Sequence, residues 1–88
     1  MDQPLNYDTI ADAGLTQSEF AELCGVSRVT VNLWIKGKMN PHRFVRDRVA
    51  EVLDLIREAH TKGSLPVAKS RGAARKKLIE AALGVTMN

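Results

Sequence analysis

Residues 25–37, GVSRVTVNLWIKG, contain more apolar side chains than one face of a short helix can hold. A surface helix normally has one apolar stripe and one polar face. With helical spacing, Val29 and Leu33 lie four residues apart on the same side. The opposite side carries the larger apolar set, Val31, Trp34 and Ile35. One of these apolar faces can pack in a core, and the pattern raises the question of what the other face contacts.

Turn and capping signals divide the region around this segment into two short helices. The sequence TQSE is a capping box, with Thr16 as the N-cap and Glu19 hydrogen-bonding back to it. Gly25 can adopt a positive φ and ends the first helix. Ser27 is a good N-cap for the next helix, which Gly37 closes. Two short helices joined by a tight glycine-containing turn are typical of a helix-turn-helix.

The rest of the chain also carries helical signals and no strong strand pattern. A short helix is predicted near the N-terminus, and Asn40 with Pro41 is predicted to cap a long fourth helix. The stretch KGSLPVAKSRG is predicted to be a connector, and AARKKLIEAALG a last helix. We therefore expect an all-α fold of four to five helices. Residues 1–63 would form a helix-turn-helix domain, and residues 64–88 a connector and a C-terminal basic and apolar helix.

Charge is unevenly distributed along the chain, although the net charge is only +3. The charged residues of the segment 1–27 are all acidic, and the cations begin at Arg28. This asymmetry suggests a polyanion, such as nucleic acid, as the partner. No run approaches the ~18 apolar residues needed to cross a membrane. The N-terminus lacks a signal-peptide pattern, so we expect a cytoplasmic protein without membrane contact.

Patterns typical of enzymes and metal sites are not found in the sequence. The single cysteine, Cys24, cannot form an internal disulfide and is expected to be a buried packing residue. His42 and His60 have no nearby cysteine or acidic cluster suited to a metal. No nucleophile–base pair or phosphate-binding glycine loop occurs. We therefore expect neither enzyme activity nor a metal or cofactor.

Several positions in the two-helix segment have the residue types that a tight helix-turn-helix requires. Ala21 is small, which allows close crossing of the helices, and Val26 fills the angle between them. The segment 17–36, followed by GKMNP, resembles the λ repressor-like (Cro/cI, XRE) family of DNA-binding domains. The resemblance covers roughly residues 5–62. The matching positions are Gln17, Ala21, Gly25, Val31, Trp34, Gly37 and Pro41.

The resemblance implies that residues 27–36 form a recognition helix, which enters the major groove. The side chains implied to face the core are Val31, Trp34 and Ile35. Those implied to face the DNA bases are Arg28, Val29, Asn32, Leu33 and Lys36. Arg28 suits guanine, Asn32 suits adenine, and the outward apolar pair suits thymine methyl groups. Phosphate contacts are implied for Gln17, Ser27, Thr30, Lys38, Asn40 and Arg43.

These residues also have simpler interpretations. Val29 and Leu33 could belong to a core or to a protein interface, and the cations could be solvated surface charges. Two positions depart from the family pattern. Ile35 replaces a usual Glu, and Ile10 replaces a frequent basic residue. We expect these two isoleucines to pack together where relatives hold an ion pair.

The C-terminal segment combines a basic cluster with an apolar run. The basic cluster consists of Lys69, Arg71, Arg75, Lys76 and Lys77. These cations could be a solvated helix face or could contact the DNA backbone. A domain this small has limited surface to cover its remaining apolar residues, so we expect self-association. The possible dimer residues are Leu55, Leu78, Ile79 and Leu83.

Together these features predict a sequence-specific regulator that binds double-stranded DNA. The most natural version is a Cro-like repressor of a phage or plasmid, acting as a homodimer on a palindromic operator. A restriction–modification controller is a close variant. The main alternative is an antitoxin or another protein-interaction module, whose C-terminal segment would bind a partner protein.

Overall fold

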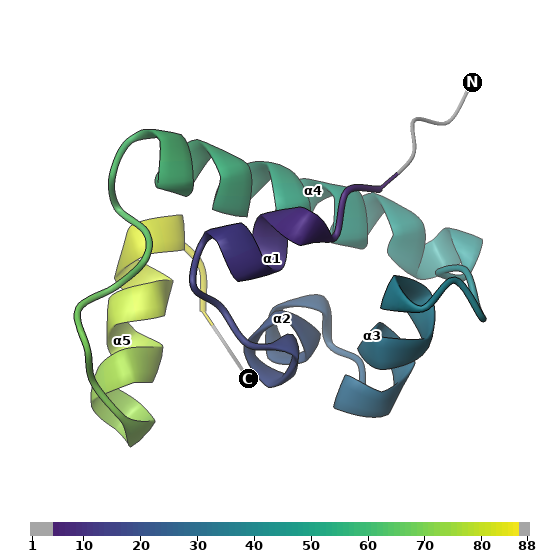
Figure 1. The fold of residues 1–88 in the computed structure, drawn as a ribbon, viewed down its shortest axis with the longest axis horizontal. Helices are drawn as coiled ribbons and strands as arrows, with labels where there is room; N and C mark the ends of the chain where they lie inside the picture. Colours follow the sequence, from purple (N-terminus) through teal and green to yellow (C-terminus); the bar gives the residue numbers. More distant parts are fainter. Residues whose placement is uncertain (1–4, 87–88) are drawn as a thin grey trace.

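The structure, a computed structural model, describes residues 5–86 and contains five α-helices and no strand in that range. The elements are α1 (Asp8–Asp12), α2 (Gln17–Cys24), α3 (Arg28–Ile35), α4 (Arg43–Thr61) and α5 (Gly72–Leu83), shown in Figure 1. The predicted all-α class with four to five helices is therefore confirmed. Residues 1–4, part of the acidic N-terminal segment, and residues 87–88 lie outside the described range.

The two short helices form where the local signals predict them. Thr16 Oγ1 accepts a hydrogen bond from the Glu19 backbone N (3.1 Å), and Glu19 Oε1 accepts one from the Thr16 backbone N (2.9 Å). This reciprocal capping box starts α2. Gly25 ends α2 at a φ of 76°, a left-handed conformation that glycine adopts without steric cost. Ser27 Oγ then accepts from the Thr30 backbone N (3.1 Å) and starts α3.

The start of α4 differs from the prediction. The helix begins at Arg43, with His42 as its N-cap, and His42 Nδ1 accepts from the Phe44 backbone N (3.3 Å). Asn40 and Pro41 instead lie in the connection from α3. Pro41 is buried, so its ring packs against the rest of the protein and does not form the first helical turn. Capping chemistry alone cannot anticipate this use of a proline.

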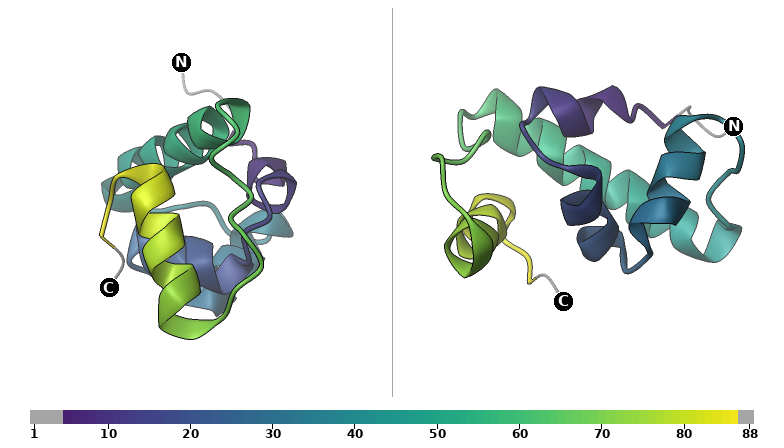
Figure 2. Two further views of the ribbon diagram at one scale, coloured as in Figure 1. Left: turned by 90° about the vertical axis from the view of Figure 1, so that its left-hand side faces the viewer. Right: turned by 60° about the horizontal axis from the view of Figure 1, so that its bottom comes forward.

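One apolar core joins all five helices. The largest fully buried side chains come from α2, α3, α4 and α5 and are Phe20, Val31, Val49, Val52, Ile56 and Ile79. The long α4 runs along one side of the molecule, with α1 beside it and α2 and α3 below, and α5 packs near the far end of α4 (Figures 1 and 2). The core therefore extends from the helical pair α2–α3 to the C-terminal helix.

The C-terminal helix supplies two of these buried side chains. Ile79 is 0% exposed and Leu83 is 7% exposed, and Leu65 of the preceding connector is also buried. This placement corrects the prediction that Ile79 and Leu83 are available to a partner subunit, because the core of the same chain already covers them. Leu78 stays exposed and Leu55 is half-buried. The helical spacing of the apolar run could not distinguish an internal contact from an external one.

Cys24 has the packing role expected of it. It is buried at the end of α2, and burial raises the pKa of its thiol to about 12, although nearby Arg48 acts in the opposite direction. The thiol is therefore neutral at physiological pH and a poor nucleophile. Arg48 Nε also donates to the Leu23 backbone O (3.3 Å), which pairs one of the carbonyls at the end of α2.

Candidate nucleic-acid interface

Helix α3 buries one side and presents the other. Val31 and Trp34 are 0% and 4% exposed, and the indole of Trp34 stacks on the ring of Tyr7 with 6.4 Å between centroids. Val29, in contrast, is 62% exposed, and Leu33 is half-buried. Val29 and Leu33 are therefore not part of the buried core. They give α3 an outer surface that a second molecule can contact.

Ile35 does not occupy the core position predicted for it. It is 39% exposed, whereas Ile10 is 3% exposed. The two positions therefore differ in burial. Ile10 of α1 belongs to the buried core, and Ile35 does not. Helical spacing predicts the directions of Trp34 and Ile35 relative to each other. It does not predict that the edge of the core lies between them.

Because Ile35 is partly exposed, the protein should tolerate a charge at this position. We expect Ile35→Glu to lower the free energy of unfolding by less than about 1 kcal/mol, because a carboxylate at a partly exposed site can stay hydrated. The matched control is Val31→Glu on the buried side of the same helix, which should cost more than about 3 kcal/mol. Urea unfolding of the two variants measures both values. Equal losses would place Ile35 in the core.

Asn32 and Gln17, which were predicted to contact a base and a phosphate respectively, contact each other in the structure. Asn32 Nδ2 donates to Gln17 Oε1 across 3.2 Å, a contact that joins the first residue of α2 to the middle of α3. Both side chains are half-buried. The amide of Asn32 is therefore held by α2 while the outer face of α3 stays accessible. Their separation of 15 residues hides this contact from any local sequence pattern.

Ser27 and Thr30 gather at the N-terminal end of α3. Ser27 Oγ accepts the capping hydrogen bond, and its distance to Thr30 Oγ1 is 2.9 Å. Arg28 is exposed directly beside them, in the first turn of the helix. Helix N-termini favour anions, because their free N–H groups and the helix dipole both attract negative charge. Hydroxyls and a guanidinium therefore lie together at an end of α3 that suits phosphate or base edges.

The connection from α3 to α4 adds further cations. Lys36 and Lys38 are exposed, as are the neighbouring Asn40 and the first residue of α4, Arg43. The Arg43 guanidinium carbon lies 5.1 Å from the centre of the Phe44 ring, a cation–π geometry. Phe44 itself is 78% exposed. Sequence reasoning assigned it no role, although its position outside the apolar stripe of α4 was a usable signal.

The C-terminal basic cluster divides into two groups. Arg75 pairs with Glu19 of α2, and Lys76 lies 3.7 Å from a carboxylate oxygen of Glu22 on the same helix. The remaining members, Lys69, Arg71 and Lys77, are exposed. Arg75 and Lys76 are thus directed at the acidic side of α2. Of the two interpretations of the cluster, a solvated helix face and a DNA-backbone contact, neither anticipated that Arg75 and Lys76 pair with α2.

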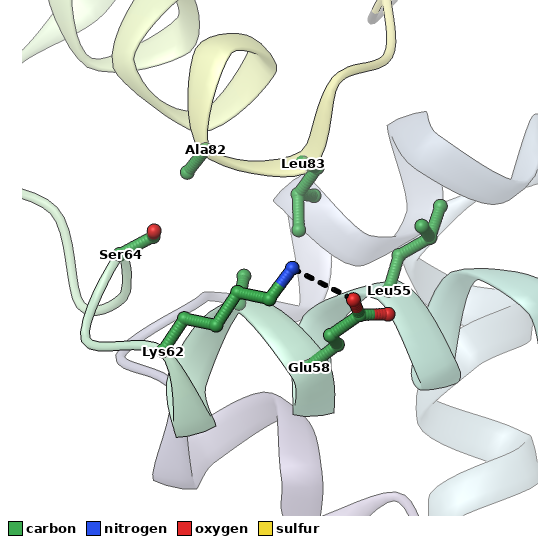
Figure 3. A pocket seen from close by; sticks show the side chains of 7 residues that line it. Leu55, Glu58, Lys62, Ser64, Ala82 and Leu83 are labelled. Atoms are coloured by element: carbon green, nitrogen blue, oxygen red, sulfur yellow. Dashed lines mark ion pairs between the residues drawn. The ribbon is translucent and has the colours of Figure 1, made fainter.

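The pocket in Figure 3 lies between the ends of α4 and α5, has a volume of about 120 Å³ and opens to solvent beside the Glu58–Lys62 ion pair (2.8 Å). Within residues 5–86 no group of three or more His, Cys, Asp or Glu side chains could hold a metal. In the same range no helix is both long and apolar enough to cross a membrane.

The pair α2–α3, with its tight turn, its buried Val31 and Trp34 and its exposed outer face, defines a helix-turn-helix protein. Residues 11–57, more than half of the 88-residue chain, match the helix-turn-helix family of the Cro/cI (XRE) type, and the chain belongs to that family. It is therefore a DNA-binding regulator whose partner is double-stranded DNA, and the family is not one of enzymes. No curated protein and no solved structure matched the chain.

Proposed function

We propose that this protein is a transcriptional repressor that binds a palindromic operator as a homodimer, with α3 of each subunit in a major groove. The observation that carries the proposal is the two-sided character of α3. Val31 and Trp34 are buried, while Arg28, Val29 and Lys36 are exposed on the outer side. A groove-binding helix needs this combination, because one side must be held rigidly while the other contacts base edges.

Each outward side chain of α3 has a base edge that suits it. The Arg28 guanidinium can bind guanine O6 and N7, and Lys36 offers a second cation at the other end of the helix. Asn32 can pair with adenine N6 and N7, and the hydrogen bond from its amide to Gln17 limits its orientation. Val29 and Leu33 supply apolar contacts for thymine methyl groups.

Phosphate contacts would surround these base contacts and set the register of the protein on the duplex. Gln17 lies at the N-terminus of α2, and Ser27 and Thr30 lie at the N-terminus of α3. Lys38, Asn40 and Arg43 follow α3 in an exposed connection. The proposed phosphate ligands therefore come from the beginning of α2, the beginning of α3 and the connection that follows α3.

A homodimer would place two copies of α3 on successive major grooves, about 34 Å apart, and would thereby explain a palindromic site. Of the predicted dimer residues, Leu55 and Leu78 are the accessible ones. We propose that the dimer acts in the cytoplasm as a Cro-like regulator of a phage or plasmid. The antitoxin alternative gains no support, because α5 is packed on the core and is not left free for a partner protein.

Selection of bound sites from random double-stranded DNA tests this proposal directly. With the full chain we expect an enriched consensus of two inverted half-sites whose centres are about 10 base pairs apart. Sedimentation of the protein with and without the selected site then reports the number of subunits bound. Failure to enrich any sequence, or a single half-site bound by one subunit, would contradict the proposed repressor.

Arg28→Ala tests the proposed base contact. We expect a loss of about 1–3 kcal/mol for the selected site, together with relaxed preference at one base pair. The control is Lys62→Ala, which removes a cation at the end of α4 remote from α3 (Figure 1). Fluorescence anisotropy on the selected site and on its single-base variants provides the measurement. Equal losses on selected and random DNA would assign Arg28 to phosphate.

A further inference from the structure

Arg75 joins the C-terminal helix to the beginning of α2. Its Nε donates to Glu19 Oε2 (2.5 Å), and its Nη2 donates to both Glu19 Oε1 (3.0 Å) and the Gly14 backbone O (2.8 Å). The Arg75 and Glu19 side chains are only 21% and 16% exposed. Bidentate arginine–carboxylate pairs have a defined geometry that a single surface contact lacks. Arg75 therefore holds both the α2 helix and the chain segment that leads into it.

The carboxylate that Arg75 binds already belongs to the capping box. Glu19 Oε1 also accepts from the Thr16 backbone N (2.9 Å), so one side chain closes the first turn of α2 and receives the arginine. Burial raises the pKa of the Glu19 carboxyl, but the hydrogen bonds from Arg75 and Thr16 outweigh it, and the pKa lies below its ordinary value. Glu19 is therefore ionised at neutral pH.

The same turn of α2 carries the residue that holds α3. Gln17 lies two positions before Glu19 and accepts the hydrogen bond from Asn32 on the recognition helix. At the other end of the connection, the buried Ile79 packs α5 on the core. A continuous set of contacts thus runs from α5 through the first turn of α2 to α3. The three helices lie along one face of the molecule in the order α5, α2, α3 (Figure 2, right).

We propose that Arg75 is a positioning residue for DNA binding: by holding Glu19 and Gly14 it fixes the first turn of α2, and through Gln17 it fixes the orientation of Asn32. This inference rests on the proposed DNA readout by α3. It assigns a role to α5, which lies outside the family-matched residues 11–57. Arg75 acts here through α2, in contrast to the direct DNA-backbone contact that was one of the two interpretations of the basic cluster.

Two substitutions distinguish positioning from a direct phosphate contact. Arg75→Gln removes the cation. Glu19→Gln removes the charge of its partner but keeps the capping box, because glutamine can also occupy that position. If Arg75 is a positioning residue, both changes should weaken binding to the selected site about three- to tenfold more than binding to random DNA. If Arg75 instead contacts phosphate, Glu19→Gln should free it and strengthen binding to both DNAs. That result would overturn the proposal.

A double-mutant cycle with Gln17→Ala tests whether the effect passes through Gln17. In that background Arg75→Gln should have little further effect on the selected site, because the contact that it positions is already absent. Full additivity would contradict the inferred connection. Lys77→Gln is the matched control, because it removes the same charge from an exposed position of the same helix. All affinities are measured at a temperature where unfolding curves show each variant fully folded.

A measurement without DNA tests by itself whether Arg75 holds the first turn of α2. In the full chain, Arg75→Gln should accelerate hydrogen exchange at the backbone amides of Thr16 and Glu19, whereas Lys77→Gln should not. If the wild-type protein selects no DNA site, the proposed repressor fails, and the positioning role fails with it. If the wild-type protein selects a site but Arg75→Gln binds it equally well, only the positioning role is overturned.

Discussion

Replacing Ile79 by alanine is expected to lower the free energy of unfolding by about 2–5 kcal/mol. Ile79 is 0% exposed and belongs to the same core as Phe20 of α2 and Ile56 of α4. The change removes buried apolar volume and leaves a cavity that the surrounding helices can fill only partly. For a chain of this length the total stability is about 4–13 kcal/mol, so the loss would be a large share of it.

The neighbouring residue provides a matched control. Leu78 is 40% exposed on the same helix, and we expect Leu78→Ala to cost less than about 1 kcal/mol. Urea unfolding at two protein concentrations measures stability and also detects any coupling to dimerisation. A stable Ile79→Ala variant with weakened self-association would show that Ile79 belongs to a subunit interface and that α5 is peripheral to the fold.

Raising the salt concentration from 50 to 200 mM is expected to weaken binding to the selected site by about 10³–10⁴-fold. The cations on and directly after α3, the proposed recognition helix, are Arg28, Lys36, Lys38 and Arg43, all exposed. Arg28 and Lys36 would bring their charge into the groove while contacting bases, and Lys38 and Arg43 would contact phosphates. If three or four of these cations displace condensed counterions in each subunit, a dimer would release the equivalent of about six to eight phosphates' counterions. The slope of log K against log salt would then be about −5 to −7.

Substitutions in the α3–α4 connection test which cations contribute. Lys38→Gln and Arg43→Gln should each make the slope shallower by about two units per dimer, because each removes one phosphate contact from both subunits. Base preference should change little, since phosphate contacts carry no direct sequence information. Lys62→Gln should leave the slope unchanged. Lys69→Gln tests whether the exposed C-terminal cations contribute to the slope. A nearly flat wild-type slope would contradict a DNA complex held by these cations.

Local chemistry made the helix-turn-helix predictable from the sequence. Thr16 and Glu19 are three residues apart, and Ser27 caps an amide three residues away, so these contacts form within single turns of the chain. Gly25 ends α2 for an equally local reason, its left-handed φ. The two-sided apolar pattern of α3 was also visible, because helical spacing fixes which side chains share a face. The family resemblance rests on these same short-range features.

The sequence by itself thus determined where α2 and α3 form and which side chains lie opposite one another. Only the tertiary structure decided where the core ends, which leaves Ile35 partly exposed and places Ile79 inside the chain. It also decided that Arg75 meets Glu19, 56 positions away, and that Asn32 meets Gln17. Periodicity and capping act within one helical turn. Contacts between distant residues, in contrast, depend on how the helices pack, which no local pattern specifies.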